Sequence, residues 1–287
     1  MKKVIKTYYA DLPNMGDLLN ELLIRDLFGQ DLERHKPATS ELSCIGSGMD
    51  CFMKKNKVYP RWYSTALKIR ANWVNYPNNV WCTGFIFSES AECPDNSFIR
   101  DMNICSVRGE MTKGRVEKIL GRKLNVPTGD GGIITPYLFD KPIEKKYQVG
   151  VVAHMHEQDH PTFQRVLNFH KGSKFINLRD DPYQVIREIA SCEVIISSSL
   201  HGLIVADSFN VPSQWIIVTD ALKGDGFKFA DYYSAFGLKP NPIPMPDESV
   251  PVPTVNQVID QFKITPEAMA AKQKEIYDAF PFKNVSV

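Results

Sequence analysis

The stretch Val194-Ile195-Ile196-Ser197-Ser198-Ser199-Leu200-His201-Gly202-Leu203-Ile204-Val205-Ala206-Asp207 decides the fold of this chain. An apolar, β-branched run ends in three serines, and a histidine and a second apolar segment follow. A run of that kind is typical of a buried strand in a parallel sheet. Serines directly before an apolar segment are typical of a helix N-terminus. The pattern therefore predicts a strand over Val194–Ser197 and a helix with His201 in its first turn.

The predicted position of His201 indicates a chemical role. Open α/β sheets bind their ligands at the carboxyl ends of the strands, and the N–H groups of a helix N-terminus attract anions. A proton-transfer residue beside an anion site favours chemistry on a phosphorylated or carboxylated substrate. A single histidine more often caps or packs its helix, so this stretch alone leaves both roles open.

The composition is that of an ordinary globular protein. Its 287 residues suffice for one large domain or two medium ones, and the formal net charge is +1. So balanced a charge gives no reason to expect nucleic acid as a partner. No apolar run approaches the roughly 20 residues that span a membrane, and the N-terminus lacks the apolar core of a signal peptide, so we expect a cytoplasmic protein. The cysteines and histidines show no zinc-binding spacing, and we expect no metal site.

Strand and helix patterns alternate along the chain, which predicts an α/β fold with parallel sheets. The predicted strands are Val4–Tyr9, Leu42–Ile45, Val80–Cys82, Ile104–Val107, Gln148–Ala153, Lys174–Leu178, Val194–Ser197 and Gln214–Val218. The predicted helices are Leu18–Leu27, Glu110–Leu120, Pro161–Phe169, Tyr183–Ser191, the His201 helix and Pro266–Phe280. The polar segment Asp140–Lys146 is the best candidate for a linker. We therefore predict two facing Rossmann-like domains in a GT-B-like arrangement, over residues 1–140 and 145–287, the second ending in a proline-rich tail and a final helix.

Further short motifs, by their order and spacing, resemble the polysaccharide pyruvyl transferase family. They are Asn14–Asn20, Ile45–Gly48, Trp81–Phe85, Val107–Glu110, Thr128–Asp130, Val149–His154, the opening stretch itself and Lys228–Tyr233. Some branches of the family have Arg-Leu-His where this chain has Ser199-Leu200-His201. A branch that modifies exopolysaccharide repeat units is similar to this chain in having serine there, so no substrate-binding arginine is expected at position 199.

The resemblance implies an enzyme that moves the enolpyruvyl group of phosphoenolpyruvate onto a sugar and closes it into a cyclic pyruvate ketal. It implies phosphoenolpyruvate as donor co-substrate without a further cofactor, and a lipid-linked saccharide as acceptor, with galactose of a polysaccharide repeat unit as the expected sugar. The N-terminal half would hold the acceptor and the C-terminal half the phosphoenolpyruvate. Two other functions fit the same expected fold: a GT-B glycosyltransferase that uses a nucleotide sugar, and a non-catalytic subunit of a polysaccharide assembly complex.

Two residues are candidates for catalysis. His201 would act as a general acid that protonates the methylene carbon of phosphoenolpyruvate. Asp17 would orient or deprotonate an acceptor hydroxyl, although an aspartate at this point could instead be the N-cap of the leucine-rich helix.

The candidates for substrate binding are polar residues at predicted strand ends and glycine turns. They are Arg108, Ser198, Ser199, Lys228, His154, Asn14 and Asp130. The planar fork of Arg108 suits a carboxylate or a phosphate, although most arginines only form solvated surface pairs. Asn14 and Asp130 could equally shape their turns.

The expected acceptor also suggests where the protein works. Repeat units of polysaccharides are commonly built on membrane lipids, so we expect a soluble enzyme that visits the inner face of the cytoplasmic membrane. Lys2, Lys3 and Lys6 would favour peripheral contact with an anionic surface, by about 1 kcal/mol each.

Overall fold

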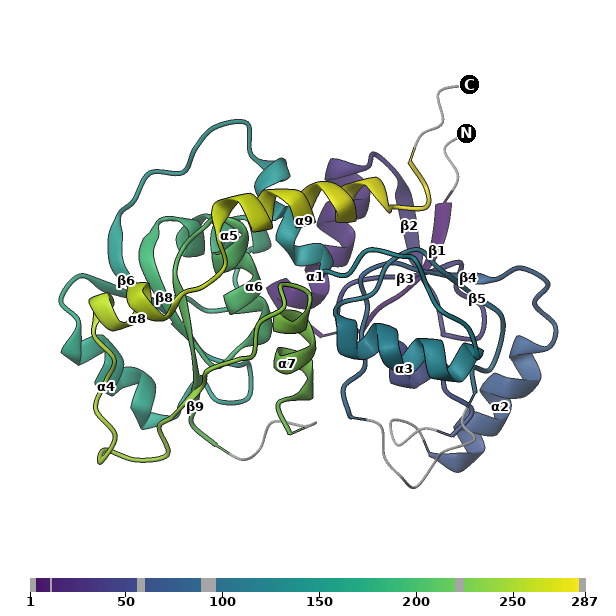
Figure 1. The fold of residues 1–287 in the computed structure, drawn as a ribbon, viewed down its shortest axis with the longest axis horizontal. Coiled ribbons are helices and arrows are strands. Elements are labelled where there is room, and N and C mark those ends of the chain that lie inside the picture. The colour runs from purple at the N-terminus through teal and green to yellow at the C-terminus, as the bar shows by residue number, and fades with distance from the viewer. Residues whose placement is uncertain (1–3, 11, 56–59, 89–96, 220–224, 284–287) are drawn as a thin grey trace.

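The fold consists of two α/β halves that lie side by side (Figure 1). The computed structural model describes residues 4–10, 12–55, 60–88, 97–219 and 225–283. Lys2 and Lys3 lie outside these residues, whereas Lys6 lies on the first strand. Within the described residues there are two five-stranded sheets, one in each half.

The sheet of the second half contains the apolar run Val194–Ser197. Its strands are β6 (Tyr147–Val152), β7 (Ser173–Phe175), β8 (Cys192–Ser197), β9 (Ser213–Ile217) and β10 (Ile243–Pro244). All neighbouring strands are parallel, in the order β7-β6-β8-β9-β10. Strand β8 is buried from Val194 to Ser197, as its unbroken apolar run predicts for a strand covered on both faces.

The sheet of the first half repeats this plan. Its strands are β1 (Val4–Tyr8), β2 (Asp31–Arg34), β3 (Leu42–Ser43), β4 (Asn78–Val80) and β5 (Met102–Ile104). They are again parallel, in the order β2-β1-β3-β4-β5. In each sheet the chain therefore runs 2-1-3-4-5, so both halves are doubly wound sheets with the α/β character that the sequence predicts.

Most of the described helices begin at a residue whose side chain caps them. They are α1 (Met15–Leu22), α2 (Arg61–Ala71), α3 (Glu110–Leu120), α4 (Pro161–Phe169), α5 (Pro182–Ala190), α6 (Leu200–Ser208), α7 (Phe227–Ser234), α8 (Val255–Gln261) and α9 (Pro266–Asp278). Asp181 caps α5 by accepting a hydrogen bond from the N–H of Gln184, and Pro182 occupies the first turn. Helix α3 ends at Gly121, whose φ of 65° is the left-handed conformation of a helix C-cap.

Several elements differ from the prediction. The expected helix through Leu27 is helix α1 followed by a π-helical segment, Leu23–Leu27. The turn-rich segment after Asp130 is a largely buried 3₁₀ helix, η3 (Gly131–Leu138). The proline-rich segment is not wholly on the surface: β10 pairs with β9, and Met245 is fully buried. Strand β2 and helices α2, α7 and α8 were not predicted.

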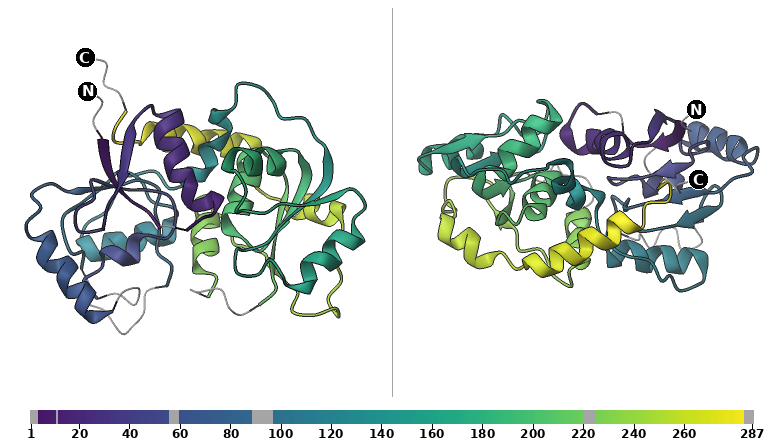
Figure 2. Two further views of the ribbon diagram at one scale, coloured as in Figure 1. Left: turned by 180° about the vertical axis from the view of Figure 1, so that it is seen from behind. Right: turned by 90° about the horizontal axis from the view of Figure 1, so that it is seen from above.

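The final helix joins the two halves. Helix α9 runs along the top of the molecule from the second half to the first (Figures 1 and 2). The indole N–H of Trp81 donates to the carbonyl oxygen of Ile276 at 3.0 Å. Just beyond α9, the ring of Phe280 stacks on Phe28, with 3.8 Å between the ring centroids. Helix α9 and Phe280 therefore pack on the first half, and residues of both halves share one hydrophobic core.

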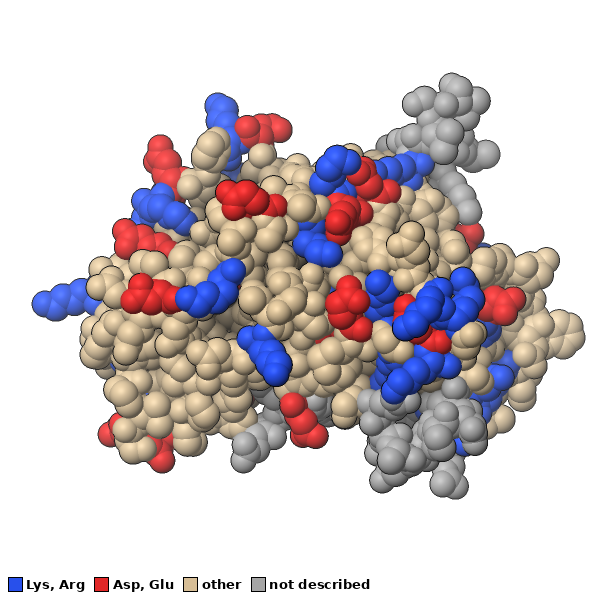
Figure 3. All heavy atoms as spheres, viewed as in Figure 1, with Lys and Arg blue, Asp and Glu red and all other residues tan. Residues whose placement is uncertain are grey.

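The surface is mixed in charge. On the face shown in Figure 3, Lys and Arg side chains lie among Asp and Glu side chains. Within the part of the chain that is described, no helix is both long and apolar enough to cross a membrane.

The contact of Phe280 with the first half leads to a prediction. Replacing Phe280 by alanine removes a ring that is 3 % exposed, and it should lower the free energy of unfolding by about 3–5 kcal/mol. Denaturant unfolding of the whole chain measures this. Phe169→Ala is the control, because that ring is 54 % exposed and its loss should have little effect. A loss below about 1 kcal/mol for Phe280→Ala would show that α9 does not hold the halves together.

Candidate functional site

The strand order locates the candidate site. In a sheet of order 2-1-3-4-5 successive strands are added first on one side of strand 1 and then on the other, so the order reverses between strands 1 and 3. Ligands bind outside the carboxyl ends of these two strands. In the first half these are β1 and β3, which lead into the loop before α1 and the Ile45–Gly48 turn. In the second half they are β6 and β8, which lead into His154 and into Ser198 and Ser199.

The first turn of α6 is built as the sequence predicts. Ser199 is the N-cap residue, although its side chain makes no capping bond, and His201 is the second residue of the helix. The N–H of Ser199 donates to the hydroxyl of Ser197 at 2.9 Å. The Ser198 hydroxyl accepts from the N–H of His154 at 2.9 Å, which ties the ends of β6 and β8 together. The N–H groups of Leu200 and the next two residues have no acceptor within the helix, so they are available to an anion.

The two sheet edges meet at this point. The N–H of Met15, the first residue of α1, donates to the carbonyl oxygen of Leu178 in the second half at 2.7 Å. The Asn14 amide nitrogen lies 3.7 Å from the sulfur of Met155. Gly16 packs directly against the ring of His201. The N-termini of α1 and α6 therefore face each other across the boundary between the halves.

Asp17 lies in the first turn of α1 without being its N-cap. Asn14 is the N-cap, and its side-chain oxygen accepts from the N–H of Asp17 at 3.3 Å. The Asn14 side-chain amide also donates to the Asp17 carboxylate at 2.5 Å. Burial raises the pKa of Asp17 to about 6, against the Asn14 bond and the positive charge of Lys228, which lower it. A carboxyl group with this pKa can exchange a proton near neutral pH, as a general base must.

Arg108 is fully buried at the boundary between the halves. Its Nε donates to the Asp231 carboxylate on α7 at 2.9 Å, and its two terminal nitrogens donate to the Ser47 hydroxyl and the Phe85 carbonyl oxygen, each at 2.6 Å. It is thus not the solvated surface arginine of the alternative interpretation. Each terminal nitrogen keeps one further N–H, and the charge of Arg108 lowers the pKa of both His201 and Lys228. Its role in substrate binding stays a prediction.

Four basic side chains act on one another at this boundary. Burial, with the charges of Lys228, Arg108 and His154, lowers the pKa of His201 to about 3. Burial, Lys228 and His156 lower the pKa of His154 to about 4. Burial and Arg108 lower the pKa of Lys228 to about 8, although Glu157 and Asp17 raise it. Burial is the largest cause of each of these shifts, and neighbouring positive charges add to it; a bound anion would offset both effects.

Asp130 lies beneath this cluster. It is fully buried, and its Oδ1 accepts from the N–H of Gly132 at 2.9 Å, which caps η3. Its other oxygen has no hydrogen-bond partner among the described residues. Burial raises its pKa to about 6, and the charge of Arg108 lowers it. The bond from Gly132 shows that Asp130 shapes its turn. Its role in acceptor binding stays a prediction.

Two residues near the cluster were not predicted. Asp231 lies three residues after Lys228 on α7, and besides Arg108 it accepts from the N–H and the hydroxyl of Thr112, each at 2.7 Å. Glu157, 4 % exposed, accepts from the Thr219 hydroxyl at 2.5 Å, and its second oxygen has no partner among the described residues. The Lys228–Tyr233 motif contained Asp231, but nothing in the sequence marked Glu157.

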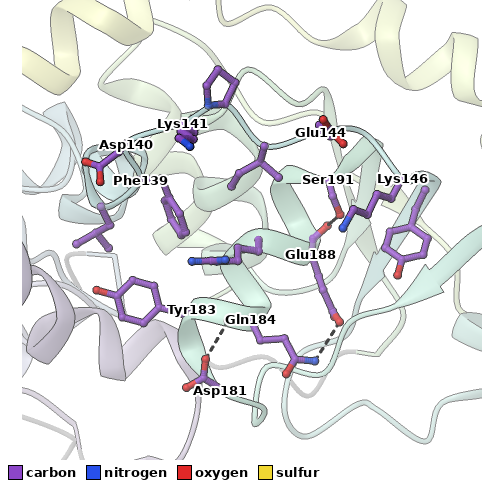
Figure 4. A pocket seen from close by; sticks show the side chains of 15 residues that line it. Phe139, Asp140, Lys141, Glu144, Lys146, Asp181, Tyr183, Gln184, Glu188 and Ser191 are labelled. Carbon is purple, nitrogen blue, oxygen red and sulfur yellow. Dashed lines mark hydrogen bonds between the residues drawn. The ribbon is translucent and has the colours of Figure 1, made fainter.

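The described residues include no group of three or more His, Cys, Asp and Glu side chains placed to hold a metal ion. A groove of about 840 Å³ lies elsewhere, between the linker that follows Phe139 and helix α5 (Figure 4). Some of its polar side chains pair with their neighbours: Gln184 donates to Glu188 at 3.1 Å, and Asp181 caps α5. None of the predicted site residues lines it.

Comparison with known proteins supports the motif-based resemblance. Residues 98–218 match the family model of polysaccharide pyruvyl transferase. This match covers less than half of the chain, and it is to the family that the motifs resemble. The matched residues include Arg108, Asp130, His154 and His201, whereas Asp17 lies outside them.

Two curated relatives match at similar levels. The chain is 29 % identical over 159 residues to the succinoglycan biosynthesis protein ExoV of Rhizobium meliloti (strain 1021), covering 53 % of this chain and 46 % of ExoV. It is 28 % identical over 137 residues to the uncharacterized protein L143 of Acanthamoeba polyphaga mimivirus, covering 46 % of this chain and 48 % of L143. The chain thus spans about half the length of each relative.

The Arg108–Asp231 pair generates a stability prediction. Asp231→Asn keeps the size of the side chain but leaves a buried guanidinium without its counter-charge, which costs about 3–5 kcal/mol. Chemical unfolding at pH 7 measures the loss. Lys274→Ala, which breaks an exposed pair with Asp278, should leave the midpoint almost unchanged. Equal effects of the two substitutions would contradict a structural role for the buried pair.

Proposed function

We propose that the chain is a pyruvyl transferase that moves the enolpyruvyl group of phosphoenolpyruvate onto a sugar and closes it into a cyclic ketal. The observation that carries the proposal is the gathering of His201, Lys228 and His154 near the buried Arg108 at the N-terminus of α6, where burial and neighbouring positive charges lower the pKa of His201, Lys228 and His154. Phosphoenolpyruvate carries a phosphate and a carboxylate, so it supplies the negative charge that this cluster lacks. The family match of residues 98–218 and the name of ExoV support the same reaction.

The low pKa of His201 fits a substrate-dependent acid. Without an anion the imidazole is neutral, because burial and neighbouring cations disfavour its charged form. A bound phosphate and carboxylate would reverse the local potential and raise this pKa. His201 would then carry a proton mainly when phosphoenolpyruvate is bound, which limits protonation to the productive complex.

The proposed reaction uses both His201 and Asp17. His201 gives a proton to the methylene carbon, and the adjacent carbon becomes cationic. A sugar hydroxyl attacks that carbon and passes its proton to Asp17. The carbon–oxygen bond to phosphate breaks, and a second hydroxyl closes the ketal and gives its proton to the departing phosphate. Arg108, Lys228 and the N–H groups of the serine turn offset the negative charge of the substrate.

The two halves would divide the substrates between them. We propose that the first half, with Asn14 and Asp17, holds the acceptor and that the second half holds phosphoenolpyruvate, in a GT-B-like arrangement. The acceptor would be a lipid-linked saccharide with galactose as the modified sugar. An acceptor of this kind would bring the enzyme to the inner face of the cytoplasmic membrane.

A donor comparison tests this function. The protein is incubated with aryl or lipid-linked galactosides and either phosphoenolpyruvate or nucleotide sugars. Phosphate release and a ketal product are expected with phosphoenolpyruvate alone, and turnover should persist in EDTA, because Arg108, Lys228 and the helix N–H groups are the proposed charge-stabilising groups. Sugar transfer from a nucleotide sugar, lost in EDTA and restored by magnesium or manganese, would instead support a glycosyltransferase.

The role of His201 predicts the behaviour of His201→Asn. Asparagine suits a helix N-terminus, so the fold should persist, while loss of the general acid should lower kcat by about 10²-fold or more. Steady-state turnover with phosphoenolpyruvate measures this. His160→Asn is a matched control, because His160 is the N-cap of α4 and has no role in the proposed chemistry. Turnover of His201→Asn near that of the wild type would remove His201 from the mechanism.

The pKa of Lys228 predicts the pH dependence of donor binding. Because this pKa is about 8, the positive charge is present below pH 8 and is lost as the pH rises through it. The affinity for phosphoenolpyruvate should therefore fall by up to tenfold per pH unit above pH 8. In Lys228→Arg the charge persists, so calorimetric titration should show a shallower decline above pH 8 than in the wild type, since only proton uptake by His201 then contributes. The same decline in both proteins would contradict this assignment.

A further inference from the structure

Gly16 makes a close approach between the two halves at the candidate site. It is the second residue of α1, and His201 is the second residue of α6. A Cβ atom on Gly16 would lie 2.1 Å from Nδ1, 2.6 Å from Cγ and 2.9 Å from Cε1 of His201. Non-bonded carbon and nitrogen atoms do not approach so closely. A side chain at position 16 and the observed position of the imidazole therefore exclude each other.

The backbone gives no other reason for this glycine. Gly16 is not among the residues with positive φ, so its conformation is open to any amino acid. It lies inside a helix, where glycine is a poorer choice than alanine. What distinguishes the position is the lack of space beside His201. The glycine is thus explained by a contact with the other half.

Both sides of this contact are held in place. On the first half, the bond from the N–H of Met15 to Leu178 fixes the start of α1 against the second half. On the second half, Gly202 lets α6 sit close to its sheet, since a Cβ there would lie 2.6 Å from the Ser197 hydroxyl and 2.8 Å from Val152. The imidazole lies between two fixed backbones, and its Nε2 is buried without a hydrogen-bond partner among the described residues.

We infer that Gly16 is a positioning residue for His201: its bare Cα lets the first turn of α1 hold the Nδ1 side of the imidazole from across the boundary between the halves. This inference rests on the proposed function, in which the imidazole transfers a proton. Through this contact the first half, which would hold the acceptor, helps to orient His201, the proposed general acid of the second half.

The consequence for catalysis is specific. In Gly16→Ala the new methyl group must displace the ring of His201. A displaced acid still allows phosphoenolpyruvate to bind to Lys228, Arg108 and the helix N–H groups, but it protonates the substrate poorly. We expect kcat to fall at least tenfold while the KM for phosphoenolpyruvate changes less than threefold. In a His201→Ala background, Gly16→Ala should lower turnover no further.

The experiment combines these activities with thermal midpoints for five proteins: wild type, Gly16→Ala, His201→Ala, the double variant and Gly114→Ala. Gly114 lies inside α3, and a Cβ there meets nothing within 4 Å, so its substitution should raise the midpoint slightly and leave turnover unchanged. Gly16→Ala should lower the midpoint in the wild type but leave it unchanged or raised in the His201→Ala background, because the clash is gone and alanine favours the helix.

The outcomes separate this inference from the proposed function. A reversal of the effect of Gly16→Ala between the two backgrounds, or folding of the double variant where Gly16→Ala alone fails to fold, supports the contact even if no turnover is found with any donor. An equal loss of midpoint in both backgrounds overturns it. If the wild type turns over phosphoenolpyruvate and Gly16→Ala keeps more than half of its kcat, the positioning role is wrong although the proposed function stands.

Discussion

The structure depends on the ion pair between Arg108 and Asp231, which joins the two halves beneath the candidate site. Both side chains are fully buried, and Asp231 also accepts two hydrogen bonds from Thr112 at the start of α3. A pair so deeply buried contributes little net stability, but either partner alone would be costly. It therefore fixes α7 of the second half on α3 of the first. Lys228 lies one turn before Asp231 on α7, so the same contact sets the position of the lysine.

This constraint turns two separate sheet edges into one site. Each sheet has the order 2-1-3-4-5, and each presents a helix N-terminus at the point where its order reverses. Because α1 and α6 start opposite each other, a carboxyl group with a raised pKa, Asp17, and a histidine with a lowered pKa, His201, belong to one cluster. Asp17 is suited to accept a proton, and His201 is suited to donate one after an anion binds. A reaction that needs both an acid and a base can use these opposite shifts.

The sequence predicted what local patterns control. The β8–α6 stretch, the position of His201 and the helices α3, α4 and α9 all follow from apolar periodicity and capping residues. Strand β2 was missed because its short polar sequence carries no alternation, and only Leu32 of it is buried. Helix α2 was missed because its apolar residues are divided between faces: Leu67 and Ala71 are buried, whereas Trp62 and Ile69 are exposed.

Contacts between distant residues could not be predicted in this way. Arg108 and Asp231 are separated by 123 positions, so nothing local distinguishes a buried paired arginine from a solvated one. The glycine at position 16 belongs to a recognisable motif, but its contact with His201 depends on how the halves meet.

We propose above all that an anion bound between the halves raises the pKa of His201 and so leaves its imidazole protonated. NMR of histidine-labelled protein at pH 7, with His201→Asn to assign the signal, tests it directly. The His201 signal should be that of a neutral imidazole in the free protein and that of an imidazolium with saturating phosphoenolpyruvate; a signal that stays neutral in the complex would contradict the account.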